Sequence, residues 1–537
     1  MKTKIITIFG GVYSSLGKGI IASSIGRILT QLGYKVAMQK MDPYLNYNSG
    51  NLSPLQHGEV FVTEDGGEGD LDLGNYERFT GVNCTKDSDI TSGVIYGEVI
   101  NDERKGKYLG STIQVIPHIT NAIKDKINSV IEKINPDFLI IEIGGTVGDL
   151  ESLPFVEAIS QFASEYGRSD FLSIIAAPLI KLSYGDEIKT KPAQHAFKSL
   201  CSLGIIPNMI ILRYSDKVKD EIFNKLSLTC HVNKENIFLS MDLPSIYLLP
   251  GELYKQKIQD AIFKHFDIKY NHKNDNFKQW ADYIKKIGKL TKKVKIAFVG
   301  KYISLKDSYR SMIESLRFAG YENNHVLDIK WVDAEKLTEK NVKRSLGDCH
   351  GILIAGGFGV RGVDGKITAI KYARENNIPI FGVCLGMQLM LIEYARNVMG
   401  LKNANSTEFD PKALAIFDSP SKTMQLGSRN CCFEKGTLAN KIYKSEKISE
   451  RFRHRYEFNN TLAEEFKKAG MGLSGYCGEE KNVLSNIELK NHPFFFGCQY
   501  HPEYAGKPQN ADLAFVEFIK ASISKKNKNK ILKKENV

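Results

Sequence analysis

The stretch FGGVYSSLGKGI, Phe9–Ile20, follows an apolar run at the start of the chain and precedes an amphipathic segment. A glycine-rich turn between a strand and a helix is the usual setting for phosphate binding. The common pattern is G-x-x-x-x-G-K-[ST], and this stretch departs from it twice. Val12 stands where the first glycine belongs, and Gly19 stands where a hydroxyl side chain would hold Mg²⁺. We therefore interpret the stretch as a phosphate-binding loop whose metal ligands lie elsewhere.

Two other segments offer carboxylates for that metal. EGDLDLGNYERF, residues 68–79, contains Asp70 and Asp72, and Glu142 ends the apolar run of DFLIIEIGG. An unpaired carboxylate at the end of a buried strand is costly unless it has a partner. Mg²⁺ is commonly held by one or two carboxylates together with substrate phosphates and water. The sequence thus predicts that Asp72 and Glu142 replace the missing hydroxyl.

The composition is typical of a globular protein with more than one domain. The chain has 537 residues, of which 42% are apolar and 25% charged, and this length favours at least two cores. The longest apolar runs, such as 171–180, are shorter than the roughly 20 residues of a membrane helix. Since the N-terminus also lacks the layout of a signal peptide, we expect a cytoplasmic protein. The nine cysteines form no C-x-x-C pair, which predicts reduced thiols rather than a disulfide framework or a zinc site.

The net charge of +12 is concentrated in two places. Residues 264–293 hold nine Lys and three Asp, and residues 524–537 hold six Lys and one Glu, so these stretches contribute 11 of the 12 charges. A solvated linker and a tail explain this distribution better than a nucleic-acid-binding face, so nucleic acid is not expected as a partner.

Apolar runs alternate with helical segments twice along the chain. Strands are predicted at 4–11, 35–42, 137–145, 171–179 and 208–214, and again at 294–302, 328–333, 351–357, 378–384 and 494–500. Near-continuous apolar runs suit parallel strands that are buried on both faces. We predict an α/β protein with two doubly wound Rossmann-like domains over 1–267 and 293–523, a linker over 268–292, and a flexible Lys-rich tail over 524–537.

A cysteine elbow marks the second domain. Cys384 lies in GVCLG directly after an apolar strand, which is the nucleophile-elbow pattern with Cys in place of Ser. Taken alone, a small buried cysteine at a strand end would explain this pattern equally well. His501 and Glu503 in QYHPEY follow another strand, and strand alternation would put them on one face, as base and orienting group for the thiol. The turn AGGFGVRG, residues 355–362, could direct backbone N–H groups at an oxyanion, or be an ordinary loop.

Together these motifs resemble the class I glutamine amidotransferase family over about residues 295–522. The resemblance implies that Cys384 attacks the glutamine amide and releases ammonia, leaving a thioester to be hydrolysed. Ala355, where many members have proline, is a minor departure. The glutamine contacts that it implies are Gly357, Leu385, Gly386, Met387, Gln388, Glu408 and Arg455.

Ammonia-producing domains are tethered to synthetases, and the first domain carries several further motifs. GGVYSSLGKGI, KMDPYLN, SPLQHGEVFVTEDGGEGDLDLGNYERF, STIQVIPHIT, EIGGTVGDLESLPF and KTKPAQH together resemble the CTP synthase family, so that the resemblance covers residues 2–522. It implies the reaction UTP + ATP + glutamine → CTP + ADP + phosphate + glutamate with Mg²⁺. In that reaction ATP phosphorylates O4 of the uracil ring and ammonia displaces the phosphate.

The resemblance also assigns binding residues, with Lys18 and Lys40 facing phosphates. For ATP they are Ser15, Leu16, Gly17, Lys18, Gly19, Ile20, Lys40, Asp72, Met241, Asp242 and Leu243, and for Mg²⁺ they are Asp72 and Glu142. For UTP and for CTP as feedback inhibitor they are Ser14, Asp149, Leu150, Glu151, Lys189, Thr190, Lys191, Pro192, Ala193, Gln194 and Lys225. His57 and Val60 match the region where the family's ammonia passage enters the synthetase site.

The resemblance further implies a homotetramer and activation by GTP, with residues 359–365 where the family's lid should lie. Tyr13 and Ala193 depart from the family's usual residues, and Ala193 does so within the set assigned to UTP and CTP. A fused amidotransferase of the cobyrinic acid diamide type would lack KTKPAQH and STIQVIPHIT. A ParA-type scaffold would carry a second lysine early in the loop, where this chain has Gly10 and Gly11, and would need no cysteine elbow.

Overall fold

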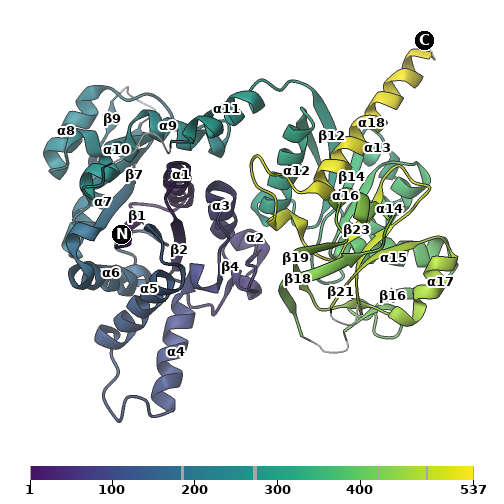
Figure 1. Ribbon diagram of the computed structural model, residues 1–537, viewed down its shortest axis with the longest axis horizontal. Coiled ribbons are helices and arrows are strands. Elements are labelled where there is room, and N and C mark those ends of the chain that lie inside the picture. Colours follow the sequence, from purple (N-terminus) through teal and green to yellow (C-terminus); the bar gives the residue numbers. More distant parts are fainter. Residues whose placement is uncertain (1, 183–186, 270–274, 420–422, 479–481, 536–537) are drawn as a thin grey trace. The chain divides into compact units, whose positions relative to one another are not determined.

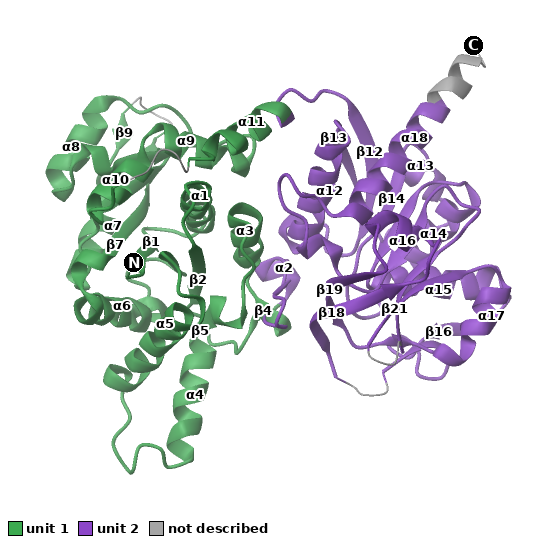
Figure 2. Ribbon diagram, in the orientation of Figure 1, with its two compact units in different colours: residues 1–52, 68–286 green, residues 53–67, 287–537 purple. Residues whose placement is uncertain are grey.

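The computed structural model describes residues 2–182, 187–269, 275–419, 423–478 and 482–535, with the side chains described as far as residue 529. The chain divides into two compact units (Figure 2). Unit 1 comprises residues 1–52 and 68–286, and unit 2 comprises residues 53–67 and 287–537.

Unit 1 is built on a seven-stranded parallel sheet with the order β11-β10-β7-β1-β6-β2-β5. Strands β7, β1 and β2 of this sheet are labelled in Figure 1. Its strands are β1 (Lys4–Gly10), β2 (Val36–Asp42), β5 (Asp89–Thr91), β6 (Phe138–Ile143), β7 (Phe171–Pro178), β10 (Met209–Arg213) and β11 (Ile237–Ser240). The five strands predicted for this domain are present, and their apolar runs are buried because helices cover both faces of the sheet.

The helices of unit 1 form a layer on each face of this sheet. They are α1 (Lys18–Gln31), α3 (Leu71–Thr80), α4 (Ser92–Arg104), α5 (Thr120–Ile134), α6 (Leu153–Tyr166), α7 (Lys191–Ser202), α8 (Asp220–Cys230), α9 (Leu249–Lys255), α10 (Ile258–His265) and α11 (Phe277–Ile287). One core joins the sheet to apolar residues of α4, α5, α6, α7 and α8. On the other face α1 packs closely, since a methyl group on its Gly26 would lie 3.1 Å from the Met38 sulfur. These layers leave the carboxyl ends of the parallel strands free to carry loops.

Unit 2 contains a nine-stranded mixed sheet with the order β13-β12-β14-β15-β23-β22-β21-β18-β19. Its strands are β12 (Lys293–Gly300), β13 (Val326–Asp333), β14 (Gly351–Ile354), β15 (Ile380–Val383), β18 (Gln425–Phe433), β19 (Lys447–His454), β21 (Gly472–Cys477), β22 (Val483–Glu488) and β23 (Phe495–Cys498). The first five in spatial order are parallel and are the five predicted strands, whereas the remaining four are antiparallel.

Helices also cover the sheet of unit 2. They are α2 (Pro54–His57), α12 (Arg310–Glu322), α13 (Val342–Leu346), α14 (Val363–Glu375), α15 (Leu385–Asn397), α16 (Leu438–Tyr443), α17 (Ala463–Lys468) and α18 (Leu513–Glu535). One apolar core lies with α13, α14, α15 and α17, and a second core lies with α12, α16 and α18. A small sheet of β16 (Ala404–Ser406), β17 (Leu414–Asp418) and β20 (Glu457–Phe458) adjoins them. The α/β class predicted for both domains is therefore confirmed.

The boundaries of the units differ from the predicted domain boundaries in three places. Residues 53–67 pack within unit 2, where the Arg451 guanidinium donates to the Val62 carbonyl at 3.0 Å. The predicted linker contains α11, whose Trp280 is buried and lies under the Arg27 guanidinium, 4.2 Å from its centre; residues 270–274 of that linker lie outside the described residues. The predicted Lys-rich tail, residues 524–537, lies on α18 as far as Glu535.

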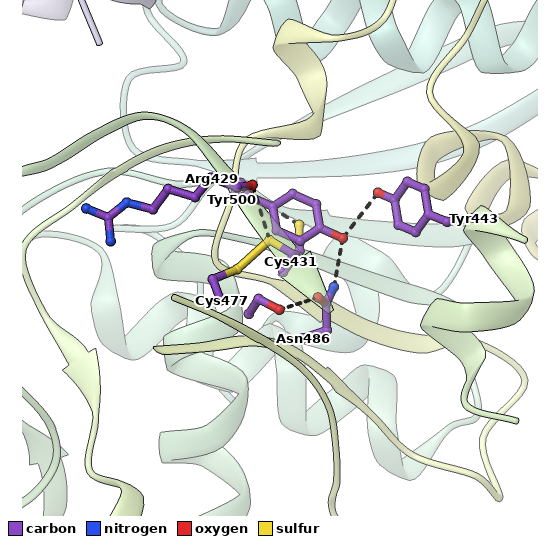
Figure 3. Close-up of a disulfide and its surroundings, with 8 residues drawn as sticks. Arg429, Cys431, Tyr443, Cys477, Asn486 and Tyr500 are labelled. Atoms are coloured by element: carbon purple, nitrogen blue, oxygen red, sulfur yellow. Dashed lines mark hydrogen bonds between the residues drawn. A yellow bond between two sulfur atoms is a disulfide. The ribbon is translucent and has the colours of Figure 1, made fainter. Parts of the chain in front are cut away.

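The cysteines also depart in part from the prediction of reduced thiols. Cys431 and Cys477 stand opposite each other on the antiparallel strands β18 and β21 and form a disulfide (Figure 3). They are 46 residues apart in the sequence, so their spacing gave no sign of the pairing. Beside the disulfide, Asn486 donates to the Tyr500 hydroxyl at 2.8 Å (Figure 3). The other seven cysteines are free thiols.

Among the described residues there is no helix with both the length and the apolar character needed to cross a membrane.

Candidate active sites

The nucleophile elbow of unit 2 lies between β15 and α15. Cys384 has φ 52° and ψ −109°, a strained conformation for a residue with a side chain, and α15 begins at the next residue. Gly382 and Gly386 make the turn possible, since a methyl group on Gly382 would lie 2.8 Å from the Gly386 carbonyl carbon. The turn therefore holds the thiol at the N-terminal end of a helix, where negative charge is favoured.

His501 and Glu503 come together next to this thiol by a different route from the predicted one. β23 ends at Cys498, and Glu503 lies in the 3₁₀ turn Pro502–Tyr504, so strand alternation does not align the two side chains. The turn instead brings His501 Nδ1 to 2.7 Å from Glu503 Oε1. A methyl group on Gly356 would lie 3.6 Å from both Cys384 Cβ and His501 Cε1, which places the ring beside the thiol.

Charge at this position favours the imidazolium that forms when His501 takes the proton of the thiol. Burial lowers the pKa of His501, but the charges of Glu503 and Cys384 outweigh it and raise this pKa to about 10. The thiol also has polar neighbours, because the Gln499 side-chain amide lies 3.5 Å from the sulfur and the Arg453 carbonyl lies 3.6 Å from it. The arrangement is a thiol next to a base that is oriented and charged by a carboxylate.

A small pocket of about 90 Å³ opens at the thiol. Its lining includes the triad, part of the glycine-rich turn, part of the segment 53–67, and further residues from the loop after β12, α12, β19 and the turn after His501. They are Pro54, Glu59, Val60, Tyr302, Ser308, Tyr309, Met312, Gly356, Gly357, Phe358, Cys384, Arg453, His501, Glu503 and Tyr504. Val60, expected near an ammonia passage, thus lines the pocket, and its carbonyl accepts from the Tyr504 hydroxyl at 3.1 Å. His57, expected in the same region, is exposed in α2 and does not line it.

The predicted glutamine contacts lie around this pocket at different distances from it. Gly357 belongs to its lining, and residues 385–388 form the buried first turn of α15. Glu408 Oε1 accepts from the Gly359 amide at 2.6 Å, whereas Arg455 is exposed and does not line the pocket. The sequence interpretation did not single out Phe358, Arg453, Gln499 or Tyr302. Phe358 and Gln499 lay within the quoted motifs AGGFGVRG and QYHPEY, but Arg453 and Tyr302 carry no pattern that could have identified them.

The glycine-rich loop of unit 1 follows β1 as predicted. Val12 and Ser15 have φ 77° and 65°, and Gly17 has φ 81° directly before Lys18 begins α1. The Lys18 ammonium donates to the Gly145 carbonyl, and burial lowers the pKa of Lys18. The loop is therefore a tight turn at a helix N-terminus with a partly buried lysine, the geometry typical of phosphate binding.

Gly19 owes its identity to Asp72. A side chain at Gly19 would overlap the Asp72 carboxylate, which occupies the space of the hydroxyl in the usual motif. Asp72 is in the first turn of α3, and its carboxylate accepts hydrogen bonds from the Lys40 ammonium and the Asn75 side-chain amide. Burial raises the pKa of Asp72, but Lys40 and these hydrogen bonds bring it below the ordinary value.

Carboxylates outnumber lysines around Lys40. Its ammonium lies 3.1 Å from Asp70 Oδ1, 3.8 Å from Glu142 Oε1 and 3.9 Å from Asp42 Oδ1, in addition to its contact with Asp72. Burial raises the pKa of Glu142 to about 7, although Lys40 opposes this shift. Among the described residues Asp42 Oδ2 has no hydrogen-bond partner, and no three acidic, His or Cys side chains form a metal site by themselves. A divalent cation with phosphate ligands fits this surplus of buried negative charge.

The other predicted nucleotide contacts follow the carboxyl ends of the same parallel strands, where ligands of such sheets bind. After β6, Asp149 Oδ2 accepts from the Thr146 amide at 2.8 Å, and Leu150 and Glu151 follow it. After β11, the Met241 carbonyl accepts from Arg213 at 3.2 Å, and Asp242 and Leu243 follow.

The predicted segment 189–194 leads from the short strand β9 (Ile188–Lys189) into α7. Thr190 precedes the helix, and its hydroxyl accepts from the Gln194 amide at 2.9 Å. Ala193 is buried, so this departure from the family faces the protein interior rather than solvent. The hydrogen bond and charge of Lys189 lower the pKa of Glu187, and the charge of Lys225, on α8, adds to this shift. Ser14 is exposed in the loop after β1.

Comparison with known proteins gives the same two halves. The family model "CTP synthase N-terminus" matches residues 4–268, and "Glutamine amidotransferase class-I" matches residues 304–521. A CTP synthase of Caldanaerobacter subterraneus is 48% identical over 536 residues, covering 98% of this chain and 99% of the relative. A Staphylococcus aureus CTP synthase is 46% identical over 534 residues, covering 97% and 99%.

A solved structure, the Trypanosoma brucei CTPS glutaminase domain with bound acivicin, is 36% identical and covers 43% of this chain and 94% of its own, with a TM-score of 0.42. Since relatives at 46–48% identity span almost the whole length of both chains, this chain belongs to the CTP synthase family.

Proposed function

We propose how this chain divides the reaction of its family between two sites. As a CTP synthase, the chain catalyses the glutamine-dependent amination of UTP to CTP, and the family uses ATP. The observation that carries the division is that each unit has its own strand-to-helix turn with distinct chemistry: a thiol at Cys384, and a lysine with carboxylates around Gly19.

Cys384, His501 and Glu503 carry glutamine hydrolysis in this proposal. The thiol proton passes to His501, the sulfur adds to the glutamine amide carbon, and the proton returns to the leaving ammonia. Water then hydrolyses the thioester to glutamate. The contact of Glu503 with Nδ1 supports this role, because it leaves Nε2 free for the thiol. The glutamine itself binds at Gly357, Leu385–Gln388, Glu408 and Arg455.

The loop before α1 and the carboxylates around Lys40 carry the phosphoryl transfer. Lys18 and Lys40 neutralise phosphate charge, and Asp72 and Glu142 would hold Mg²⁺, supported by the surplus of buried carboxylates there. When bound, the metal ion supplies charge neutralisation on the ATP phosphates. Met241–Leu243 contact the adenine of ATP. UTP or inhibitory CTP binds at Ser14, residues 149–151, residues 189–194 and Lys225. GTP activation, a homotetramer and a cytoplasmic location remain predictions from the family and the sequence.

The decisive experiment measures CTP formation from UTP, ATP and Mg²⁺ with either glutamine or ammonium as nitrogen source. Cys384→Ala should abolish the use of glutamine and spare the use of ammonia, since only the first requires the thiol. Cys432→Ala, which changes a free thiol elsewhere in unit 2, is the matched control. Loss of both activities in a folded Cys384→Ala protein would contradict the division proposed here.

A further inference from the structure

A fully buried lysine lies beneath the glycine-rich turn of unit 2, and the function proposed above does not use it. Lys366, on α14, has an exposed fraction of 0%. Within the described part of the chain its ammonium forms no ion pair, so its burial carries a cost that some interaction must offset. Burial and the nearby charge of Lys301 lower the pKa of Lys366 to about 7, although the charge of Cys384 opposes this shift.

The partners of this ammonium are backbone carbonyls of the turn. Lys366 Nζ donates to the Ala355 carbonyl at 2.6 Å and to the Gly356 carbonyl at 3.3 Å. The second buried lysine, Lys301, donates to the carbonyl of Phe358 and, at 3.1 Å, to that of the next residue. Two ammonium groups thus bind four of the five carbonyls of residues 355–359.

The carbonyl contacts fix the direction of an amide. In a planar trans peptide the C=O and the following N–H point in opposite directions. Because the Gly356 carbonyl points to Lys366, the Gly357 N–H points the other way, and Gly357 lines the pocket of Cys384. Among the described residues this amide has no hydrogen-bond acceptor. If the same peptide were reversed, the Gly356 carbonyl would instead present negative charge to the pocket.

We infer that Lys366 is a positioning residue for glutamine hydrolysis, holding the 356–357 peptide so that the Gly357 N–H faces the oxyanion of the tetrahedral intermediate. The inference rests on the proposed role of Cys384. In that step the S–C bond forms, the π pair of the amide C=O moves to oxygen, and the thiol proton goes to His501. A backbone N–H aimed beforehand at this oxygen stabilises the transition state without reorganisation.

Lys366→Met tests the inference, since methionine keeps most of the side-chain volume and loses every N–H donor. The expected result is a fall in kcat for glutamate release of about 10²-fold, typical of losing one oxyanion donor, with the KM for glutamine kept. Alkylation of Cys384 by iodoacetamide, followed by mass spectrometry of its peptide, should keep its wild-type rate, because displacing iodide builds no oxyanion. Lys371→Met is the matched control: it lies on the same helix, but its ammonium bonds Glu339 at 2.9 Å.

Three outcomes would overturn the inference: an unchanged kcat, a raised KM with kcat kept, or an alkylation rate that falls in step with kcat. If Lys366→Met does not fold, Lys366→Ala with added methylammonium replaces it. If methylammonium restores glutamate release, a cation beneath the turn is supported. If glutamate release is not restored in folded protein, or if methylammonium restores folding alone, the positioning role is contradicted. Cys384→Ala run in parallel separates the two proposals, because glutamate release without the thiol would refute the proposed function itself.

Discussion

Each unit places its candidate site at a turn between a parallel strand and the helix that follows it, but the two turns present different chemical groups. In unit 1 the turn between β1 and α1 presents backbone amides and Lys18, and in unit 2 the turn between β15 and α15 presents the Cys384 thiol. Both turns need residues with positive φ, because a strand must reverse direction into a helix within a few residues. What differs is how the charges around each turn are balanced.

Unit 2 balances the charge of its catalytic imidazole internally. His501 is paired with Glu503 at 2.7 Å, so its base is oriented before any substrate arrives. Unit 1 does not: Lys40 faces four carboxylates, and burial raises the pKa of Glu142 to about 7. The difference teaches that the base of the thiol site is oriented by the chain alone, whereas in the function proposed here a cation and phosphates would balance the carboxylates around Lys40.

Glu503→Gln removes the negative charge that pairs with His501 in unit 2 and should have the largest effect on activity. Because the amide cannot charge the imidazole in the same way, we expect glutamate release to fall by about 10³- to 10⁴-fold, as in other triads. CTP formation from ammonium should persist. Steady-state rates with both nitrogen sources check this, with Glu446→Gln, whose carboxylate pairs with Lys435 at the surface, as the control. A loss below tenfold would mean that Glu503 is not the orienting group.

Asp72→Asn breaks the charge arrangement of unit 1 and should have the next largest effect. CTP formation should fall by about 10²- to 10³-fold with glutamine and ammonium alike, since one charged group at the reacting phosphate is lost. Asp87→Asn, at a surface ion pair with Lys133, is the control. An activity that drops with glutamine only would place Asp72 outside the phosphoryl-transfer site.

Gly19→Ser restores the usual phosphate-loop motif on paper and should nevertheless damage the enzyme. The new side chain would overlap the Asp72 carboxylate, and displacing a catalytic group by about 1 Å can cost up to about 10²-fold. We expect CTP formation to fall by about 10- to 10²-fold with either nitrogen source. Gly251→Ser is the control, because a methyl group there has no atom within 4 Å. Full activity of Gly19→Ser would show that Asp72 can move without consequence.

Much of the fold could be predicted because the parallel strands are buried on both faces. All ten strands proposed from apolar runs are present, but β18, β19, β21 and β22 were not proposed. Two of these, β18 and β19, mix buried residues with partly or fully exposed ones and include charged side chains, so they lack the continuous apolar signal. The placement of residues 53–67 in unit 2 depends on contacts distant in sequence, such as that between Val62 and Arg451, which no local pattern encodes.

The candidate sites show the same limit. Cys384 and Lys18 could be identified because each lies in a local strand–turn–helix motif. Asp72 could be proposed because Gly19 stands where the usual phosphate-binding loop has a hydroxyl side chain. The pairing of His501 with Glu503 was expected for a wrong reason, since a 3₁₀ turn rather than a strand joins them. Lys366 gave no signal at all, because a lysine in an amphipathic helix normally faces solvent and only the packing of α14 buries it.

The smallest expected effect is on the pH dependence of the free energy of unfolding, which tests the pairing of His501 with Glu503 directly. The pKa of His501 is raised from 6.5 to about 10, so the stabilisation from its protonated form is fully present below pH 6.5 and is lost as pH rises through 10. One proton released on unfolding changes the free energy of unfolding by at most about 1.4 kcal/mol per pH unit. Because the charge of Glu503 is the largest cause that raises this pKa, the slope between pH 7 and 10 should be shallower in Glu503→Gln. Thermal unfolding of the full chain at pH 7, 8, 9 and 10 measures it, against Glu446→Gln, and equal slopes in the two variants would show that the imidazole is not held protonated by Glu503.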